Sequence, residues 1–489
     1  MGVSGVWVGV DLGTQSARAL VATGTGRVAG LGVERLASLR DGTRHEQDPD
    51  AWWRAVGAAC RRALAQADEP REVRGIAVAA TSGTVLLTDR RGEPLTPGLM
   101  YDDGRAAGLV DRVNEAGARV WEDLGYRRMQ PTWALPKVLW LLGEHRRPGA
   151  RLAHQADFVN RRLTGHEVPA DLGGALKTGA HLVDEDWPRD VLDALGVPAD
   201  LLPRLVRPGA LIGTVCADAA RHTGLPVGTP VVAGTTDGCA AQIGAGALRP
   251  GDWNSVLGTT LVIKGVTREP LRDPLGVVYS HRAPDGGWWP GGASSTGAGV
   301  IAREFPGRDP EELISLAETC HPAKPVAYPL VGTGERFPFA APDAEGFVLG
   351  GPPASEGERM AALLAGIGFV ERLCFDHFDL LGAPVEGPLT LTGGATRSAR
   401  WCALRAEILR RPVLLPENSE PALGAAVLAA SPGRRLADVA AEMVRIRRTV
   451  EPRPGRRFDD AYLRLVGELA RRGWLPAELA AHATERTGL

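Results

Sequence analysis

Apolar residues occur along this chain in short, strand-like runs that end in polar or glycine-rich turns. One run ends at Asp11, turns through Leu12-Gly13-Thr14-Gln15-Ser16 and continues as a second apolar run, so residues 6–22 are predicted to form a β-hairpin. Residues 252–265 repeat the pattern about half a chain later, with Leu257-Gly258-Thr259-Thr260 at the turn. The repeat predicts two similar domains, each containing one hairpin.

Between and after the hairpins, strand patterns alternate with helical ones. Asp48 is a suitable N-cap for a helix that begins at Pro49, because an Asp side chain accepts hydrogen bonds from first-turn amides. Further strands are expected at 27–36, 75–89 (a strand, a turn and a strand), 230–233, 389–391 and 413–415. Further helices are expected within 107–147 and at 155–164, 359–381, 399–409 and 422–430. This alternation predicts an α/β fold.

Composition narrows the class of protein. The 489 residues suit two or three domains, and 44% hydrophobic residues are enough for a large core. A net charge of −2 gives no support for a nucleic-acid partner. The chain lacks an apolar run of about 18 residues and a basic leader, so we expect neither a membrane span nor a signal peptide. Six scattered cysteines without a CxxC pair are typical of a reducing, cytoplasmic setting.

Several enzyme classes are excluded by missing motifs. There is no Gly-Lys dipeptide, so a P-loop kinase is excluded, and there is no HExxH zinc motif. The glycine-rich stretch at 287–299 does not have the GxGxxG spacing of a dinucleotide-binding turn, which excludes the common dehydrogenases.

The two hairpin turns carry the residue types that bind phosphate. Glycine allows backbone N–H groups to approach a large anion, and hydroxyls add donors. Asp11 stands at a strand end, where its carboxylate can hold a hydrated Mg²⁺. One such turn alone is equally well explained as an ordinary polar hairpin, but its repetition favours phosphate binding.

Polar residues also follow three other predicted strands. Asp237 lies in the first turn of a helix among small residues, where it can be either a catalytic carboxylate or a helix cap. Ser82 follows a strand at the edge where α/β sheets bind ligands. Asp103 and Arg105 supply an acceptor and a donor for sugar hydroxyls, a solvated turn being the alternative. Lys177 is either a substrate contact or a surface residue.

A fourth turn, Gly393-Gly394-Ala395, leaves room for a flat ring against the backbone, here adenine and ribose. The small-residue helix expected at 422–430 can pack closely against this turn. The alternative is a tight turn alone.

Taken together, these motifs resemble the FGGY family of carbohydrate kinases. The matching pieces occur in the family's order, at 11–16, 46–53, 102–105, 235–238, 257–260, 328–338, 393–395 and 422–426. The resemblance implies two actin-like (ribonuclease H-like) α/β domains of the sugar kinase, Hsp70 and actin superfold, with a cleft between them. Residues 1–248 would bind sugar and supply the catalytic base, and residues 249–489 would bind ATP.

The resemblance also implies residue roles. Asp237 matches the general base that takes the proton of the sugar's terminal hydroxyl, and Asp11 matches the carboxylate that organises Mg²⁺. The residues implied at the sugar are Asp11, Ser82, Asp103, Arg105 and Asp237. The residues implied at ATP are Gly13, Thr14, Gln15, Ser16, Gly258, Thr259, Thr260, Gly393, Gly394 and Ala395.

The sugar is indicated by the loop at 80–84. Xylulokinases carry a Gln-Met-His-Gly phrase here, whereas this chain has Thr81-Ser82-Gly83-Thr84 and looks more like the D-ribulose kinase branch. The pieces at 175–177, 279–282 and 292–294 also resemble that branch. We therefore expect a pentulose kinase that prefers D-ribulose to D-xylulose, with glycerol or a hexulose as further options.

For partners we expect sugar and ATP, no nucleic acid and no membrane, and a homodimer is a candidate assembly. The competing class is a non-catalytic ATP-dependent switch of the same superfold. Such a switch needs no carboxylate at the sugar, so Asp237 and the turn at 102–105 speak against it.

Overall fold

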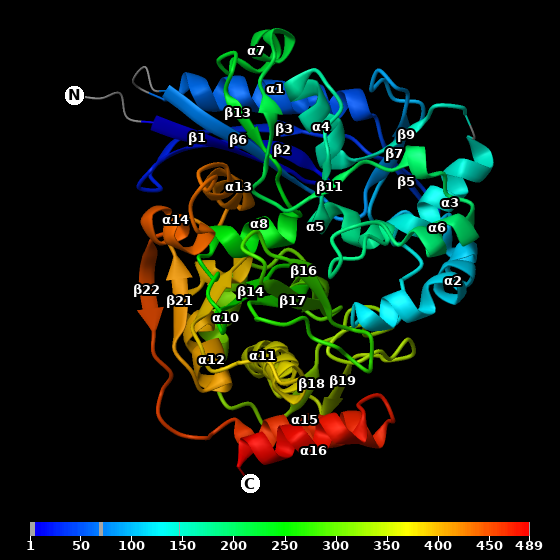
Figure 1. Cartoon of the computed structure of the whole chain (residues 1–489). Coiled ribbons are helices and arrows are strands. Elements are labelled where there is room, and N and C mark those ends of the chain that lie inside the picture. The colour runs from blue at the N-terminus through cyan, green and yellow to red at the C-terminus, as the bar shows by residue number, and fades with distance from the viewer. Residues whose placement is uncertain (1–4, 68–71, 146, 489) are drawn as a thin grey trace. The chain divides into compact units, whose positions relative to one another are not determined.

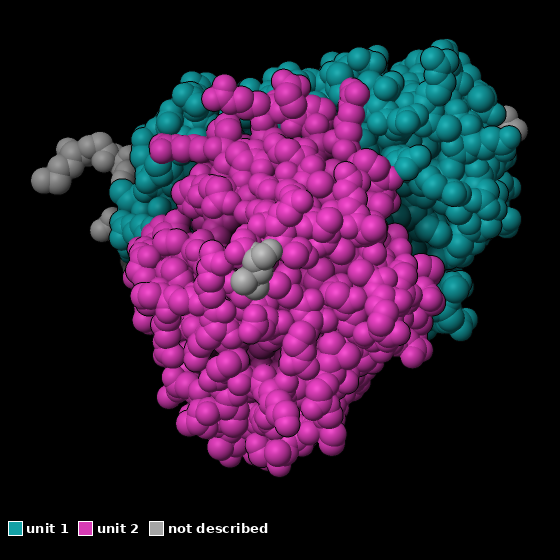
Figure 2. Space-filling view, turned by 90° about the horizontal axis from the view of Figure 1, so that it is seen from below, with its two compact units in different colours: residues 1–248, 281–289, 418–445 teal, residues 249–280, 290–417, 446–489 magenta. Residues whose placement is uncertain are grey.

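A computed structural model describes residues 5–67, 72–145 and 147–488 of the chain. The chain divides into two units, coloured separately in Figure 2. The first unit comprises residues 1–248, 281–289 and 418–445, and the second comprises 249–280, 290–417 and 446–489. The chain therefore returns twice to the first unit after leaving it at Leu248.

The first unit is built on a six-stranded sheet of order β12-β13-β6-β1-β2-β3 (Figure 1). Strand β1 pairs antiparallel with β2 and parallel with β6, which itself runs parallel to β13. The strands are β1 (Gly5–Leu12), β2 (Ser16–Thr23), β3 (Val28–Arg35), β6 (Glu72–Ala80), β12 (Leu211–Thr214) and β13 (Pro230–Val232). The predicted hairpin at 6–22 is therefore confirmed as β1 and β2.

Side chains of β1 alternate between the two faces of this sheet, as a strand requires. Val6, Val8 and Val10 are buried in the core that includes helix α1 (Pro49–Ala65). On the other face, a Cβ at Gly9 would overlap the backbone of Ala422 in helix α13, so the helix lies directly on the strand. Asp11 belongs to this second face because it lies two residues beyond Gly9.

Helices and a second sheet complete the first unit. The second sheet has the order β4-β5-β8-β7-β9. Its strands are β4 (Leu39–Asp41), β5 (Arg44–Gln47), β7 (Val85–Thr88), β8 (Gly98–Leu99) and β9 (Arg151–His154), and a separate ribbon joins β10 (Ala170–Asp171) to β11 (Leu205–Val206). The helices are α1, α2 (Val110–Asp123), α3 (Ala134–Glu144), α4 (Gln155–Thr164), α5 (Leu172–Ala175), α6 (Arg189–Leu195), α7 (Ala217–Thr223), α8 (Asp237–Gly244), α13 (Pro421–Ala429) and α14 (Leu436–Met443).

The second unit repeats this topology. Its strands belong to a sheet of order β16-β17-β15-β14-β20-β21-β22, in which residues 281–282 of β16 and 288–289 of β17 are grouped with the first unit. Strand β14 pairs antiparallel with β15 and parallel with β20. The strands are β14 (Trp253–Leu257), β15 (Leu261–Gly265), β16 (Tyr279–Arg282), β17 (Trp288–Ala293), β20 (Leu389–Thr392), β21 (Val413–Pro416) and β22 (Ile446–Val450), with β18 (Val326–Tyr328) and β19 (Phe347–Leu349) in a separate ribbon. Thus β14, β15 and β20 correspond to β1, β2 and β6.

The core of the second unit surrounds a long helix, α11 (Glu356–Leu380), which is buried on almost every side. One buried ion pair ties it to the sheet and to its neighbour: Arg405 donates two hydrogen bonds to Glu371, which also accepts one from Ser255 of β14. The other helices are α9 (Gly299–Glu304), α10 (Pro310–Glu318), α12 (Ala399–Leu409), α15 (Asp459–Arg471) and α16 (Ala477–Thr487).

Helix α13 matches the small-residue helix predicted at 422–430, whose sequence allows close packing against the turn at 393–395. It belongs to the first unit, where Ala425 packs with Ala79 of β6 and Ala240 of α8. A Cβ at Gly424 would overlap the carbonyl oxygen of Ala240, so α13 and α8 touch backbone to backbone. Small residues here allow two helices to lie side by side on the sheet.

Two expectations from composition can be compared with the structure. All six cysteines, each of them among the described residues, are free thiols. Within the described ranges, none of the helices is both long and apolar enough to cross a membrane.

Candidate active site

Asp11 is a buried carboxylate with the charged side chains of Asp237, Glu420 and Arg18 nearby. Its side chain emerges at the end of β1, and the residue is only 8% exposed. Burial raises the pKa of Asp11 to about 7, and the nearby carboxylates of Asp237 and Glu420 act in the same direction, opposed by Arg18. Asp237 begins α8, and Glu420 immediately precedes α13. The end of β1 therefore faces the N-terminal ends of two helices.

Asp237 is the first residue of α8, but it is not the helix cap. The cap is Thr236, whose hydroxyl accepts a hydrogen bond from the amide of Cys239. Asp237 accepts a hydrogen bond from the adjacent Gly238 amide at 2.7 Å and is partly exposed. Asp237 is therefore not explained as a helix cap, because Thr236 caps α8. Its carboxylate lies near Asp11.

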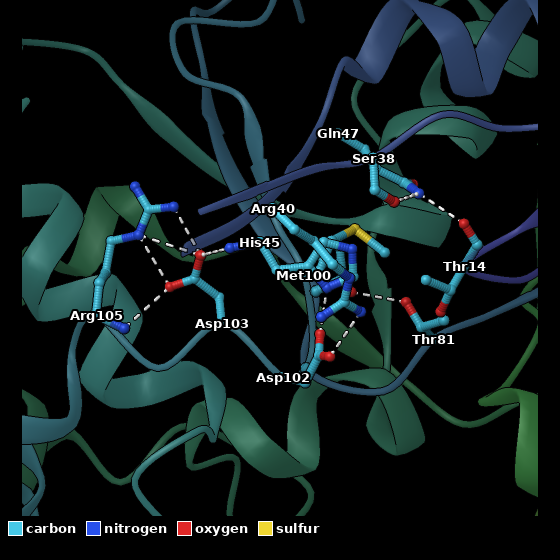
Figure 3. A network of polar contacts seen from close by, with 12 residues as sticks. Thr14, Ser38, Arg40, His45, Gln47, Thr81, Met100, Asp102, Asp103 and Arg105 are labelled. Carbon is cyan, nitrogen blue, oxygen red and sulfur yellow. Dashed lines mark hydrogen bonds and ion pairs between the residues drawn. The ribbon is translucent and has the colours of Figure 1, made fainter. Parts of the chain in front are cut away.

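The tip of the first hairpin is held by a side chain of strand β5, which follows it in the sequence. The Gly13 amide donates to the Ser16 carbonyl at 3.0 Å, and Gln47 donates to the Thr14 carbonyl at 2.6 Å (Figure 3). Gln47 in turn accepts a hydrogen bond from the indole of Trp52 in α1. The segment 46–53 thus has a structural role that was not assigned from the sequence, because Gln47 and Trp52 fix the backbone of the tip.

Asp103 and Arg105 form the centre of a buried polar network (Figure 3). Asp103 is fully buried and accepts hydrogen bonds from the His45 amide at 2.8 Å and from the Arg105 guanidinium at 2.6 to 3.1 Å. Arg105 also donates to Glu46 at 2.7 Å, and its guanidinium lies over the ring of Trp140. Both oxygens of Asp103 therefore hold Arg105 and β5 in place.

Two lysines hold the loop that contains Ser82. Lys137 of α3 is fully buried and donates to the carbonyls of Gly83 and Met100 at 2.6 and 2.7 Å. Burial lowers the pKa of Lys137 to about 7, and the charge of Lys177 acts in the same direction. Lys177 itself donates to the Ser82 carbonyl at 3.3 Å. Nothing in the sequence around Lys137 had indicated this function, because it lies within an otherwise apolar helix.

Several polar atoms near this loop lack hydrogen-bond partners. In the part of the chain that the structure describes, these include the buried Ser82 Oγ, Gln155 Nε2 and Thr235 Oγ1. Ser82 follows β6 and Thr235 follows β13, and the Thr235 carbonyl accepts a hydrogen bond from the Ala80 amide. Gln155, the first residue of α4, binds Thr81 through its other side-chain atom, so the three residues surround the ends of these two strands. Buried polar groups are normally paired, so a partner rich in hydroxyl groups suits this position.

In the second unit, the hairpin tip Gly258–Thr260 resembles the first. The Gly258 amide donates to the Thr260 carbonyl at 3.1 Å, and Thr259 is exposed. The hairpins differ in one respect, because aligning the two tips places Val256 where the first has Asp11. A carboxylate suited to a cation therefore accompanies only the first tip.

The turn at 393–395 follows β20 in the second unit. Gly393 has φ +86°, and a Cβ there would lie 2.5 Å from the Leu257 carbonyl oxygen, so both conformation and space require glycine. Gly394 is exposed, and a Cβ there would meet nothing within 4 Å. The backbone at Gly394 is thus accessible to a flat group.

The side chains near Asp11 can supply only some of the ligands that a bound Mg²⁺ needs. Among the described residues, no group of three or more His, Cys, Asp and Glu side chains converges. Mg²⁺ commonly uses one or two carboxylates and completes its shell with water and substrate phosphates. Asp11 fits this arrangement as one carboxylate ligand, since a cation would offset the burial and the neighbouring charge of Asp237 that together raise the pKa of Asp11.

Comparison with known proteins identifies the class. Residues 6–244 match the N-terminal domain and residues 253–432 the C-terminal domain of the FGGY family of carbohydrate kinases. The chain belongs to this family and is a carbohydrate kinase. The expected family and the actin-like α/β fold are confirmed.

Individual relatives carry several substrate names. A xylulose kinase of Streptomyces coelicolor is 32% identical, and the match covers 86% of this chain and 87% of the relative. A gluconokinase of Bacillus subtilis is 26% identical, with 86% of each covered. The solved structure of a xylulose kinase from Rhodospirillum rubrum aligns with a TM-score of 0.86 at 26% identity, covering 95% of this chain and 98% of the other.

Proposed function

We propose that this kinase transfers the γ-phosphoryl group of ATP to the terminal hydroxyl of a ketopentose, with D-ribulose as the preferred sugar. The observation that carries the proposal is the position of Asp237, a partly exposed carboxylate that begins α8 beside Asp11 and does not cap the helix. We assign the sugar and the base to the first unit and ATP to the hairpin and turn of the second.

Phosphoryl transfer depends on positioning and on neutralising charge more than on covalent help from the protein. Asp237 would accept the proton of the attacking hydroxyl, a role that requires a carboxylate near the sugar. Asp11 would hold Mg²⁺, which would neutralise charge on the phosphate oxygens. The tips at Gly13–Ser16 and Gly258–Thr260 would donate backbone and hydroxyl hydrogen bonds to the phosphates, and Gly393–Ala395 would lie against the adenosine.

The polar atoms beside the ends of β6 and β13 and at the start of α4 support a polyol as acceptor. Ser82, Gln155 and Thr235 each present a buried side-chain atom without a partner among the described residues. A sugar offers hydroxyls that both donate and accept, so it satisfies such mixed groups. Arg105 would also contact the sugar, and the buried Asp103, first expected at the sugar itself, would hold the Arg105 guanidinium in position.

The choice of D-ribulose rests on the loop Thr81-Ser82-Gly83-Thr84, which lacks the Met and His of the xylulokinase phrase. D-Xylulose is the second candidate, because curated relatives at 27 to 32% identity are named xylulose kinases. The two sugars differ only in configuration at C3, so a few loop side chains can decide between them.

Initial rates of ADP formation with Mg·ATP test the proposal. The acceptors are D-ribulose, D-xylulose, L-ribulose, gluconate, glycerol and no sugar. A higher kcat/KM for D-ribulose than for any other acceptor supports the proposal in full. Preference for D-xylulose would retain the mechanism and overturn our interpretation of the loop, and a preference for gluconate or glycerol would overturn the pentulose assignment.

A further inference from the structure

A buried carboxylate outside the residues discussed so far lies close to the second hairpin. Glu335, in the segment between β18 and β19, is 3% exposed and accepts five hydrogen bonds. Its Oε1 atom accepts from the amides of Ser295 at 2.6 Å and Arg336 at 3.0 Å. Its Oε2 atom accepts from the hydroxyls of Ser294 and Tyr328 at 3.0 Å and of Thr296 at 3.1 Å. The carboxylate is thus fully enclosed by protein donors.

Three of these donors belong to one short segment, residues 294–296, which follows β17. This segment continues into residues that bind the hairpin through backbone hydrogen bonds. Leu261 exchanges backbone hydrogen bonds with Ser294 and Thr296 at 2.9 and 2.8 Å. The amide of Ala298 donates to the Gly258 carbonyl at 2.9 Å, and that of Gly299 donates to the Thr259 carbonyl at 3.1 Å.

The segment and the tip are also in direct steric contact. A Cβ at Gly297 would overlap the carbonyl oxygen of Thr259, and a Cβ at Gly299 would lie 2.9 Å from the Thr259 side chain. The tip Gly258–Thr260 therefore packs against residues 294–299, and Glu335 holds the first three residues of that segment through hydrogen bonds.

We propose that Glu335 is a positioning residue for nucleotide binding. By holding residues 294–299 in one register, it presets the backbone of Gly258–Thr260 in the conformation that receives phosphate. This inference rests on the proposed role of the hairpin in binding ATP. Its physical basis is preorganisation, because a tip that is ordered beforehand loses less conformational entropy when it binds an anion.

A matched pair of variants separates positioning from general stabilisation. Thr296→Val and Tyr328→Phe each remove one hydroxyl donor from the same atom, Glu335 Oε2, at nearly equal distances. Both residues are buried, at 0% and 1% exposure. Thr296 belongs to the segment under the tip, whereas Tyr328 lies in β18. A purely structural role for Glu335 predicts similar effects of the two substitutions.

The probe is Mg·ADP, titrated by calorimetry into the full chain, with KM for ATP and for the preferred sugar measured alongside. We expect Thr296→Val to weaken ADP binding about tenfold, the cost of ordering about one more residue of the tip when ADP binds. Tyr328→Phe should weaken it less than about twofold on the same scale, and KM for the sugar should change little in both variants.

Equal ADP affinities in the two variants, or no change in either, would overturn the inference while leaving the proposed function intact. Failure of the wild-type protein to bind ADP would overturn the proposed nucleotide site together with the inference. If Thr296→Val does not fold, Ser294→Ala takes its place, since Ser294 donates to the same oxygen from the same segment.

Discussion

Replacing Asp11 by Asn tests whether this carboxylate is kept at a cost to stability for the sake of function. Burial is the main reason that the pKa of Asp11 rises from 3.8 to about 7, with Asp237 and Glu420 adding to it. Asn has the same shape and no charge. In the folded wild-type protein above pH 7, Asp11 is an anion in a buried position beside another carboxylate. The variant removes that unfavourable charge.

The direction in which stability changes with pH follows from how many protons the folded and unfolded states bind. Between pH 3.8 and about 7, the folded state keeps the Asp11 proton and the unfolded state loses it. Stability of the wild-type protein therefore falls as pH rises through this window, and it loses on the order of 4 kcal/mol in total at about 1.36 kcal/mol per pKa unit. With ~2.1 cal/mol/K of unfolding entropy per residue, this loss corresponds to about 4 °C in Tm for the whole chain.

Thermal unfolding of wild-type and Asp11→Asn protein, without ligands, from pH 4 to pH 8 measures the effect. We expect equal Tm values near pH 4 and a Tm about 4 °C higher for Asn at pH 8. Added Mg·ADP should raise the Tm of the wild-type protein more than that of the variant at pH 8. A variant that is less stable than wild type at pH 8 would refute the reasoning, as would an equal response to Mg·ADP.

Two further predictions concern residues that hold the sugar-side loops. Arg105→Ala leaves the buried Asp103 without its ionic partner, although the His45 amide still donates to it. The substitution should cost about 3–5 kcal/mol of stability and raise KM for the sugar more than KM for ATP, with Arg105→Lys intermediate; an unchanged Tm, or equal changes in both KM values, would contradict this. Lys137→Met leaves the Gly83 carbonyl unpaired and removes one of the two hydrogen bonds to the Met100 carbonyl, which the Asp103 amide still contacts. It should cost about 1–3 kcal/mol and raise KM for the sugar; a selective change in KM for ATP would contradict it.

Local patterns were sufficient to predict most of the elements near the site. The helix beginning at Pro49 with Asp48 as its cap is confirmed, as are α4 and α12 at their predicted limits. These elements are determined by capping residues and by hydrophobic periodicity, which act over a few neighbouring positions. The repeated hairpin was predictable for the same reason, and its repetition indicated two related units.

Contacts between distant parts of the chain could not be predicted in this way. Helix α13 lies on β1 and α8 although its sequence would fit equally well against another glycine-rich turn. Lys137 binds carbonyls that lie at least 37 residues away in the sequence. Glu335 binds donors that lie up to 41 residues away. No local pattern distinguishes them from ordinary surface residues. Their roles appear only when the fold brings their partners together.

The central claim is that this kinase uses Asp237 as the base for phosphoryl transfer to a sugar. The most direct test compares sugar-dependent ADP formation by wild-type and Asp237→Asn protein, with Mg·ADP affinity measured in parallel. We predict that kcat falls by ~10²–10⁴, the usual contribution of a general base, while ADP affinity stays within a few-fold. Unchanged turnover in the Asp237→Asn protein would contradict the assignment.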